Sequence, residues 1–575
     1  MKQFKFKAKT TAIAMIASAC TAGPVFANGD GYEVWGADQS NSVSGVASRG
    51  VNGSYMWIWD SKDVEKQLKG GKEAQPLGCD GKNRAGDGPC NVLDVFPADL
   101  AEHDAAGSTG FTLGDLPSFG RLHGMLPDPQ NRYMNVNMFA PGGGYVGIVD
   151  GGTKEAVALF RVTETNGSPV QRSLHMSFWN SDGSALMLAN LPGTVLERIN
   201  ITRNAGGKII GADFDQAASL GVGKNMVRTD TAKVYLGRNG QGNRMIGSIS
   251  GQYDYDAFAN LTPNGACKEN GCGEGPDGAV GGRPNNVIIC PIVSDNDNAY
   301  VTFGGGGLLV ADTTTTPMTI VGEYGNGVVN GAGCGGVQVG DNMWLNAGVS
   351  ASGAGATQST FTMYTIDDTG FTNSPNPPNE PSPTLVFKDT TNTATGGNVG
   401  GVGPNGSGQL PGITTRRDAH GMTRTVSGSH IHNVDRIQNN VEVFDTATLA
   451  RTTYDLTSFD GQGNGLGACA DTSVTDDALL PGNDPAPDLM DKTPDGKYLV
   501  VALRGPIPVS VTHSAQGSCP GVGIIEVLDG GASGRLAGVL RTTNTVDTAP
   551  VSAPGGHPYT GFEHSDVHGA AVRKK

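Results

Sequence analysis

Seven polar residues stand at one position of a repeated sequence pattern, and most of them are good metal ligands. His123 lies ten residues before Tyr133, and His420 lies ten residues before His430, which begins the β-rich run His-Ile-His-Asn-Val-Asp-Arg. The same spacing occurs in other units, and the last copy reaches the C-terminus before its tenth residue. The seven equivalent residues are His123, His175, Cys290, Cys334, His420, Asp488 and His568.

Imidazoles, thiols and one carboxylate form a soft-to-borderline ligand set, which suits copper or zinc better than calcium or magnesium. The sequence contains 10 histidines, and four of them share this single repeat position. We therefore predict a copper site with His123, His175, His420 and His568 as ligands. Asp488, Cys290 and Cys334 are possible further ligands. In the alternative interpretation, these polar residues only bond to the backbone around a water-filled channel.

Charged residues directly before the predicted ligands suggest supporting roles. Asp418 and Asp566 each stand two residues before such a histidine, on the same side of an extended strand. Ligating imidazoles commonly donate their other N–H to a carboxylate, so we expect both acids to hold an imidazole. Arg416 and Arg417 could bind an anion, because guanidinium groups suit oxyanions. Ion pairs between structural units are the other interpretation of these arginines.

The elements that position these residues are short strands. Each unit contains the polar residue, an apolar strand, a turn and further strands, such as 441–445 and 524–529. The turns are rich in Asp, Asn and Gly, as in 180–183 and 494–496, and these residues are typical of tight turns. The later strands alternate or are apolar throughout. The pattern predicts an all-β fold, a single seven-bladed β-propeller.

The two chain ends complete one unit between them. The C-terminal copy at His568 lacks its later strands, whereas the segment that begins Asp30-Gly-Tyr32 has later strands but no copy of the repeat position before them. We expect the C-terminal strand to become the innermost strand of the N-terminal blade, which removes a free sheet edge.

The segment Pro494-Asp-Gly-Lys-Tyr-Leu-Val-Val-Ala502 resembles the repeat of the YVTN family of seven-bladed propellers. The resemblance covers nearly the whole chain after the signal segment. It implies the fold and leaves the activity open, because this fold hosts many activities.

More distantly, the sequence resembles the copper propellers nitrous oxide reductase and thiocyanate dehydrogenase. The resemblance lies in His123-Gly-Met, His420-Gly-Met and His568-Gly-Ala at equivalent positions. It implies a copper site at the channel mouth. The sequence has fewer such histidines than nitrous oxide reductase uses, and no cupredoxin-like domain follows. Electrons would therefore pass to an external acceptor such as a c-type cytochrome.

Residues 1–27 have the pattern of a secretory signal, with four lysines before an apolar stretch and cleavage expected after Ala27. No later apolar run approaches the roughly 20 residues that a membrane span needs. Residues 28–575 would form the propeller, in the periplasm or outside the cell. They carry 36 basic and 55 acidic side chains, a net charge of −19, which argues against nucleic acid or anionic membrane as a partner.

Eight cysteines remain after signal removal, an even number in an oxidising compartment, which favours disulfides. Sequence proximity pairs Cys79 with Cys90 and Cys267 with Cys272, and Cys469 with Cys519 would join two loops around one blade. Cys290 and Cys334 are either a disulfide that lines the channel or metal ligands.

Long insertions interrupt the repeat between the end of one unit and the polar residue of the next. We expect them to surround one mouth of the channel, since long loops on one face commonly carry function. The insertions are residues 61–118, 202–285, 367–415, 446–487 and 541–565.

Three function classes remain open. The favoured one is a copper-dependent oxidoreductase that acts on a small substrate at the channel mouth. The others are a non-catalytic binding propeller at the cell surface and a lactonase-like hydrolase. The hydrolase would need carboxylates around a hard cation, and the repeat position offers only Asp488.

Overall fold

The structure is a computed structural model. It describes residues 31–39, 54–81, 89–96, 122–140, 143–162, 174–191, 195–221, 227–230, 233–238, 244–248, 251–254, 288–304, 306–325, 328–329, 333–352, 355–371, 380–389, 394–395, 417–474, 482–506, 515, 517–542 and 565–575.

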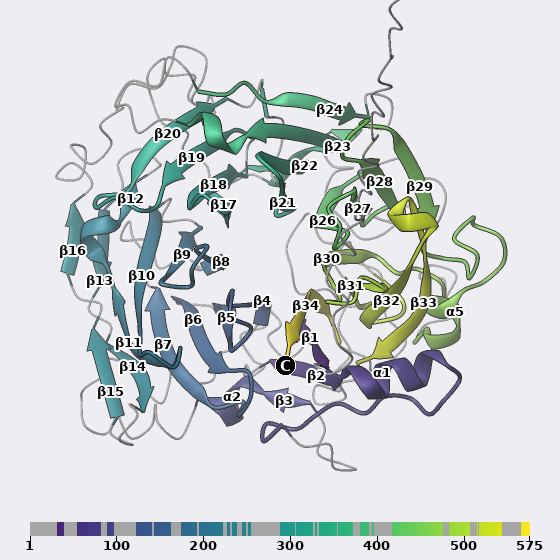
Figure 1. The fold of residues 1–575 in the computed structure, drawn as a ribbon, viewed down its shortest axis with the longest axis horizontal. Coiled ribbons are helices and arrows are strands. Elements are labelled where there is room, and N and C mark those ends of the chain that lie inside the picture. The colour runs from purple at the N-terminus through teal and green to yellow at the C-terminus, as the bar shows by residue number, and fades with distance from the viewer. Residues whose placement is uncertain are drawn as a thin grey trace, which may run out of the picture. The chain divides into compact units, whose positions relative to one another are not determined.

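Seven blades, each built on four antiparallel strands, form a ring within Gly31–Lys575 (Figure 1). The strands of each blade are given from the innermost to the outermost. Blade 1 contains β4 (Leu122–Pro127), β5 (Tyr133–Ala140), β6 (Gly143–Asp150) and β7 (Ala156–Val162), and blade 2 contains β8 (Leu174–Trp179), β9 (Ala185–Asn190), β10 (Val195–Arg203) and β11 (Ile209–Phe214). Blade 3 contains β17 (Ile288–Val293), β18 (Asn298–Phe303), β19 (Leu308–Asp312) and β20 (Thr319–Tyr324), and blade 4 contains β21 (Gly336–Val339), β22 (Asn342–Ser352), β23 (Gly355–Asp367) and β24 (Thr384–Lys388).

Blade 5 contains β26 (Ala419–Arg424), β27 (His430–Asp435), β28 (Asn440–Asp445) and β29 (Arg451–Asp455), and blade 6 contains β30 (Pro487–Lys492), β31 (Tyr498–Leu503), β32 (Gly521–Leu528) and β33 (Ser533–Arg541). Blade 7 contains β34 (Val567–Lys574), β1 (Tyr32–Asp38), β2 (Tyr55–Asp60) and β3 (Cys90–Asn91). The additional elements are β12 (Leu220–Gly221), β13 (Val227–Asp230), β14 (Lys233–Arg238), β15 (Arg244–Ser248), β16 (Gly251–Asp254), β25 (Ala394–Thr395), α1 (Ser61–Leu68), α2 (Val92–Val95), α5 (Ala468–Thr472), η2 (Gln216–Ala218), η4 (Asp368–Gly370) and η7 (Asp529–Gly531).

The chain ends close the ring as the sequence predicts. β34 pairs antiparallel with β1, with Trp35 opposite Ala571, and the Lys575 backbone N–H donates to the Gly31 carbonyl at 2.9 Å. Every inner strand begins within two residues of its predicted polar residue, and the seven inner strands face the centre of the ring (Figure 1). The prediction of a seven-bladed propeller is confirmed.

Apolar side chains from the faces of neighbouring blades form the core. Val34 and Trp59 of blade 7, for example, share one buried cluster with Val500 and Ile524 of blade 6. Each blade therefore buries apolar residues on both faces, which explains why strands such as β31 are apolar without interruption.

The predicted insertions are in part outer strands. The segment 446–487 contains β29 (Arg451–Asp455), and 202–285 contains β11 (Ile209–Phe214). β29 reads Arg-Thr-Thr-Tyr-Asp, and its first three side chains are exposed. An outermost strand has only partial cover from its neighbours, so its sequence lacks the apolar signal of an inner strand.

Three disulfides lie within the described residues. Cys79–Cys90 and Cys469–Cys519 confirm two predicted pairs, and Cys290 is bonded to Cys334. The predicted pair Cys267 and Cys272 falls outside the described residues, as do residues 1–27. No helix among the residues with described structure has the length and apolar character that a membrane crossing requires.

Buried His432 in blade 5 gives the fold a predicted sensitivity to acid. Its Nε2 lies 2.9 Å from the Gly531 carbonyl and its Nδ1 lies 3.1 Å from the Tyr454 hydroxyl. Burial lowers the pKa of His432 to about 4, whereas the unfolded chain titrates near 6.5. Between these values the unfolded state binds the extra proton, so the free energy of unfolding falls as the pH is lowered.

We expect this side chain to remove about 2 kcal/mol of stability between pH 7 and pH 5. Urea unfolding of wild type and His432→Gln at both pH values measures the difference. If the free energy of unfolding fell equally in the two proteins between pH 7 and pH 5, this assignment would be contradicted.

Candidate metal centre in the channel

The four predicted histidine ligands converge. His123, His175, His420 and His568 lie on β4, β8, β26 and β34, and each is at most 7% exposed. The Nε2 atoms of His123 and His175 are 3.0 Å apart. The ring of His568 stacks on His123 with 3.7 Å between centroids, and its centroid lies 5.9 Å from that of His420. Residues up to 445 positions apart in the sequence therefore share one buried cluster.

Glycines beside these histidines allow the inner strands to approach. A Cβ atom on Gly421 would lie 2.1 Å from the backbone oxygen of Asp488, and one on Gly569 would lie 3.1 Å from the Cα of Gly124. The His-Gly pairs of the sequence thus have a steric cause, because a larger residue would push neighbouring blades apart.

Asp488 supplies the carboxylate of the cluster. Its Oδ1 lies 2.5 Å from His420 Nδ1, and its Oδ2 lies 3.8 Å from His568 Nε2. His420 Nδ1 and Asp488 Oδ1 are buried and have no hydrogen-bond partner of acceptable geometry, despite their short separation. One donor atom from each of the three residues lies within 4.8 Å of the others. The three residues therefore fit a shared cation.

The protonation states favour metal binding. His568 Nδ1 lies 2.7 Å from the His123 carbonyl. A carbonyl can only accept, so Nδ1 carries the proton and Nε2 presents its lone pair toward Asp488. Burial lowers the pKa of His568 well below its ordinary value. Although burial alone would raise the pKa of Asp488, its contacts with His420, His568 and the Arg436 guanidinium hold it well below its ordinary value.

A buried chain of alternating charges runs behind Asp488. The Asp418 carboxylate binds Arg436 at 2.6 Å, and Arg436 lies 3.6 Å from Asp488. Arg504 binds Asp488 at 2.8 Å and Asp566 at 2.6 Å. All five side chains are at most 1% exposed. With every member ionised, three carboxylates face two guanidinium groups, so this row of five side chains carries one excess negative charge beside the imidazoles.

The two acids predicted to hold imidazoles bind guanidinium groups. The Asp418 and Asp566 carboxylates accept hydrogen bonds from Arg436 and Arg504, both at 2.6 Å. Asp488 is the acid against His420. The pairing of β26 with β27 shifts register between Ala419 and Met422. Such a bulge changes which side chains share a face, so the two-residue spacing is not a reliable guide here.

Arg417 is part of an ion-pair network. It contacts Asp435 at 2.6 Å, Asp389 at 3.3 Å and Glu442 at 2.5 Å, and its guanidinium lies 4.5 Å from the centre of the Phe361 ring. These contacts agree with the ion-pair interpretation of this arginine. Arg416 lies outside the described residues.

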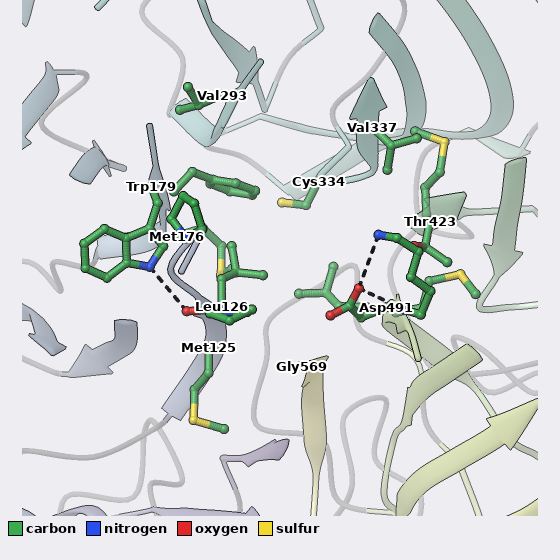
Figure 2. Close-up of a pocket in the computed structure, with 18 of the residues that line it drawn as sticks. Met125, Leu126, Met176, Trp179, Val293, Cys334, Val337, Thr423, Asp491 and Gly569 are labelled. Carbon is green, nitrogen blue, oxygen red and sulfur yellow. Dashed lines mark hydrogen bonds and ion pairs between the residues drawn. The ribbon is translucent and has the colours of Figure 1, made fainter. Parts of the chain in front are cut away.

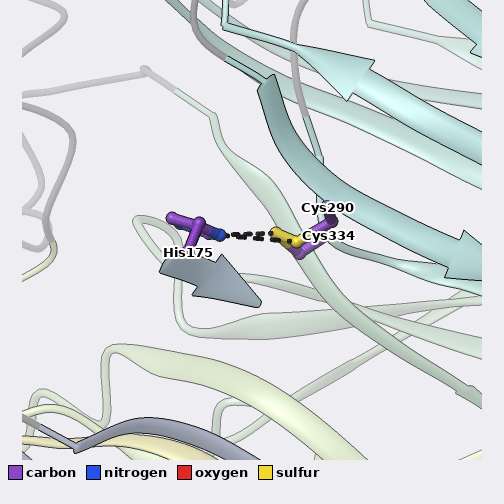
Figure 3. A group of neighbouring side chains, drawn as sticks. All are labelled: His175, Cys290 and Cys334. Carbon is purple, nitrogen blue, oxygen red and sulfur yellow. Dashed lines mark hydrogen bonds between the residues drawn. A yellow bond between two sulfur atoms is a disulfide. The ribbon is translucent and has the colours of Figure 1, made fainter. Parts of the chain in front are cut away.

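The disulfide Cys290–Cys334 lies beside the histidine cluster (Figure 3). His175 Nδ1 is 3.5 Å from Cys290 Sγ and 3.7 Å from Cys334 Sγ. In this oxidation state the two cysteines have no free thiolate, so the alternative in which they ligate a metal does not apply.

A pocket of about 400 Å³ is lined by residues that follow the clustered side chains along the inner strands, and by the turns after those strands (Figure 2). The four histidines and Asp488 are not among its lining residues. Its apolar lining includes four methionines, each one or two residues after one of the seven repeat-position residues: Met125, Met176, Met422 and Met490. Cys334 also lines it, and Ser181 and Ser294 stand at its turn end. The insertions were expected to surround one mouth of the channel. The repeated methionines are the sequence signal for this pocket and were not part of that prediction.

No protein-family model matches the sequence, and no curated protein matches it. Several solved structures are similar at low identity. A protein from Lactobacillus plantarum is 10% identical, with 95% of this chain and 100% of that chain covered and a TM-score of 0.43. The periplasmic gluconolactonase of Pseudomonas aeruginosa is 11% identical over 87% of this chain and 100% of that chain, with a TM-score of 0.36. The dihydro-heme d1 dehydrogenase NirN is 9% identical over 94% and 74%, with a TM-score of 0.33.

Proposed function

We propose that this protein is an extracytoplasmic copper-dependent oxidoreductase that acts on a small substrate in the propeller channel. The observation that carries the proposal is the convergence of His123, His175, His420 and His568 in one buried cluster, with two Nε2 atoms 3.0 Å apart. Asp488 lies within ligand-sharing distance of two of them, His420 and His568.

The donor set favours copper over hard cations. Imidazole nitrogens suit copper and zinc, whereas calcium and magnesium require several oxygen ligands. Asp488 is the carboxylate among the candidate ligands, and it also neutralises Arg504. The lactonase-like alternative needs a hard cation and therefore receives less support from this cluster. Thioethers of the pocket methionines are soft donors that suit cuprous copper.

Bound copper would supply one-electron chemistry, and the chain would supply binding and exclusion of water. The pocket limits the substrate to a small molecule, because about 400 Å³ is near the lower end of ligand sites. A small inorganic or organic sulfur or nitrogen compound fits this size. The net charge of −19 after signal removal suits a basic electron acceptor, such as a c-type cytochrome.

Elemental analysis of protein purified from its own host tests the proposal. We expect copper at about one or more ions per chain, because imidazole sites of this kind bind copper most tightly among divalent first-row metals. Zinc in place of copper would exclude a redox role, because zinc has no redox chemistry. A metal-free native preparation would favour the non-catalytic binding propeller.

A further inference from the structure

Three donor atoms on the far side of His175 form a second group of potential ligands. His175 Nδ1, Cys290 Sγ and Cys334 Sγ are buried and lie within 4.8 Å of one another (Figure 3). They come from three consecutive blades: β8, β17 and the segment directly before β21. The Nε2 atom of the same imidazole faces His123. A neutral imidazole has one lone pair, so His175 would bind a metal either in this group or in the copper centre, and not in both at once.

The spacing of these atoms matches a tetrahedral metal site. Metal–sulfur bonds of about 2.3 Å and metal–nitrogen bonds of about 2.0 Å, at a tetrahedral angle, separate nitrogen from sulfur by about 3.5 Å. The observed nitrogen–sulfur distances are 3.5 and 3.7 Å. The nitrogen already has the required separation from both sulfurs, and only the sulfurs must part.

The other two described disulfides have different surroundings. The polar atoms near Cys79–Cys90 and Cys469–Cys519 are oxygens, such as the Asn91 carbonyl at 3.9 Å and the Ser518 hydroxyl at 3.8 Å. An imidazole nitrogen approaches only the Cys290–Cys334 pair among these three. A cross-link that served stability alone would not need this neighbour.

We propose that reduction of Cys290–Cys334 creates a redox-gated Cys₂His site for a thiophilic ion such as Zn²⁺ or Cu⁺. An external dithiol supplies two electrons and two protons and becomes a disulfide, while the Cys290–Cys334 bond breaks and yields two thiols. Metal binding then releases both thiol protons, since thiolate is the ligand form. Oxidation by the reverse exchange expels the ion.

The pocket provides access for the reductant. Cys334 lines the pocket and is 8% exposed, whereas Cys290 is fully buried. Figure 2 shows the Cys334 side chain among the apolar residues of this lining. A small dithiol in the pocket therefore meets Cys334 first, and Cys290 leaves as the thiolate next to His175.

The test uses Co²⁺ as the probe on the complete protein. Protein reduced with dithiothreitol and desalted without oxygen should bind Co²⁺ with a thiolate-to-cobalt charge-transfer band, and oxidised protein should show no such band. His175→Ala keeps both sulfurs, and its Co²⁺ affinity should fall at least about 100-fold, because even loss of an outer partner costs about 10–100-fold. Cys290→Ser with Cys334→Ser should lack the band, as long as its circular dichroism shows a folded protein.

Matched controls separate this site from other thiols and from the copper centre. Cys79→Ser with Cys90→Ser, and Cys469→Ser with Cys519→Ser, should retain the band after reduction. His420→Ala should also retain it, since that residue belongs to the proposed copper centre. An absent band in reduced wild type, or full affinity in reduced His175→Ala, would overturn the proposal and leave the copper centre untouched.

Discussion

Replacing His420 by alanine is expected to remove copper from the protein and abolish oxidoreductase activity while the fold remains intact. His420 Nδ1 lies 2.5 Å from Asp488 Oδ1 in the buried ligand group. The side chain faces the channel axis, and the inner strand keeps its backbone contact, since the His420 carbonyl accepts from Asn346. Copper per chain should fall at least about tenfold, because loss of one ligand costs more than the 10–100-fold typical of an outer partner.

Copper content, activity and thermal unfolding of the same preparation measure these effects. His430→Ala is the matched control, because His430 lies in the same blade and makes its hydrogen bond to Ser429. It should retain full copper. The copper assignment fails if His420→Ala keeps the wild-type copper content, or if it loses copper only together with its fold.

The fold was predictable because its signals are local. Turns such as Pro494-Asp-Gly496 are predicted from their residue types, and Gly496 has the positive φ, 70°, that this glycine suggests. Apolar alternation marks the inner strands, and repeat equivalence then aligns the polar residues at their starts. Ring closure followed from the half unit at each chain end. Convergence of His123, His175, His420 and His568 needed no further information, because equivalent positions of inner strands face one axis.

The partners inside the site were not predictable in the same way. Pairing of Asp418 with Arg436, and of Asp566 with Arg504, depends on bulges and on contacts between blades. Neither is encoded by spacing along the chain. The polar outer strand 451–455 carries no apolar period and was taken for part of an insertion. The choice between ligand and disulfide for Cys290 likewise rests on the distance between blades 3 and 4, which spacing along the sequence does not give.

Arg504→Met is expected to lower the free energy of unfolding by about 3–5 kcal/mol, the usual cost of leaving buried charges unpaired. Arg504 is fully buried, and its loss would remove the guanidinium that binds both Asp488 and Asp566. Asp488 would keep only the more distant Arg436, at 3.6 Å. Methionine keeps the length and apolar character of the stem, so the effect reports the charge. Urea unfolding at pH 7 measures it.

The surface pair Lys497–Asp495 in the same blade provides the comparison, with side chains 63% and 32% exposed and 3.1 Å apart. Lys497→Met should cost at most about 1 kcal/mol, because water screens exposed pairs. Combining Arg504→Met with Asp566→Asn should recover part of the loss, since one of the two stranded charges disappears. Asp488 remains charged in that double variant and limits the recovery. If Arg504→Met were no more destabilising than Lys497→Met, the alternating charges would not support the channel wall, and Asp488 would need another source of stabilisation as a ligand.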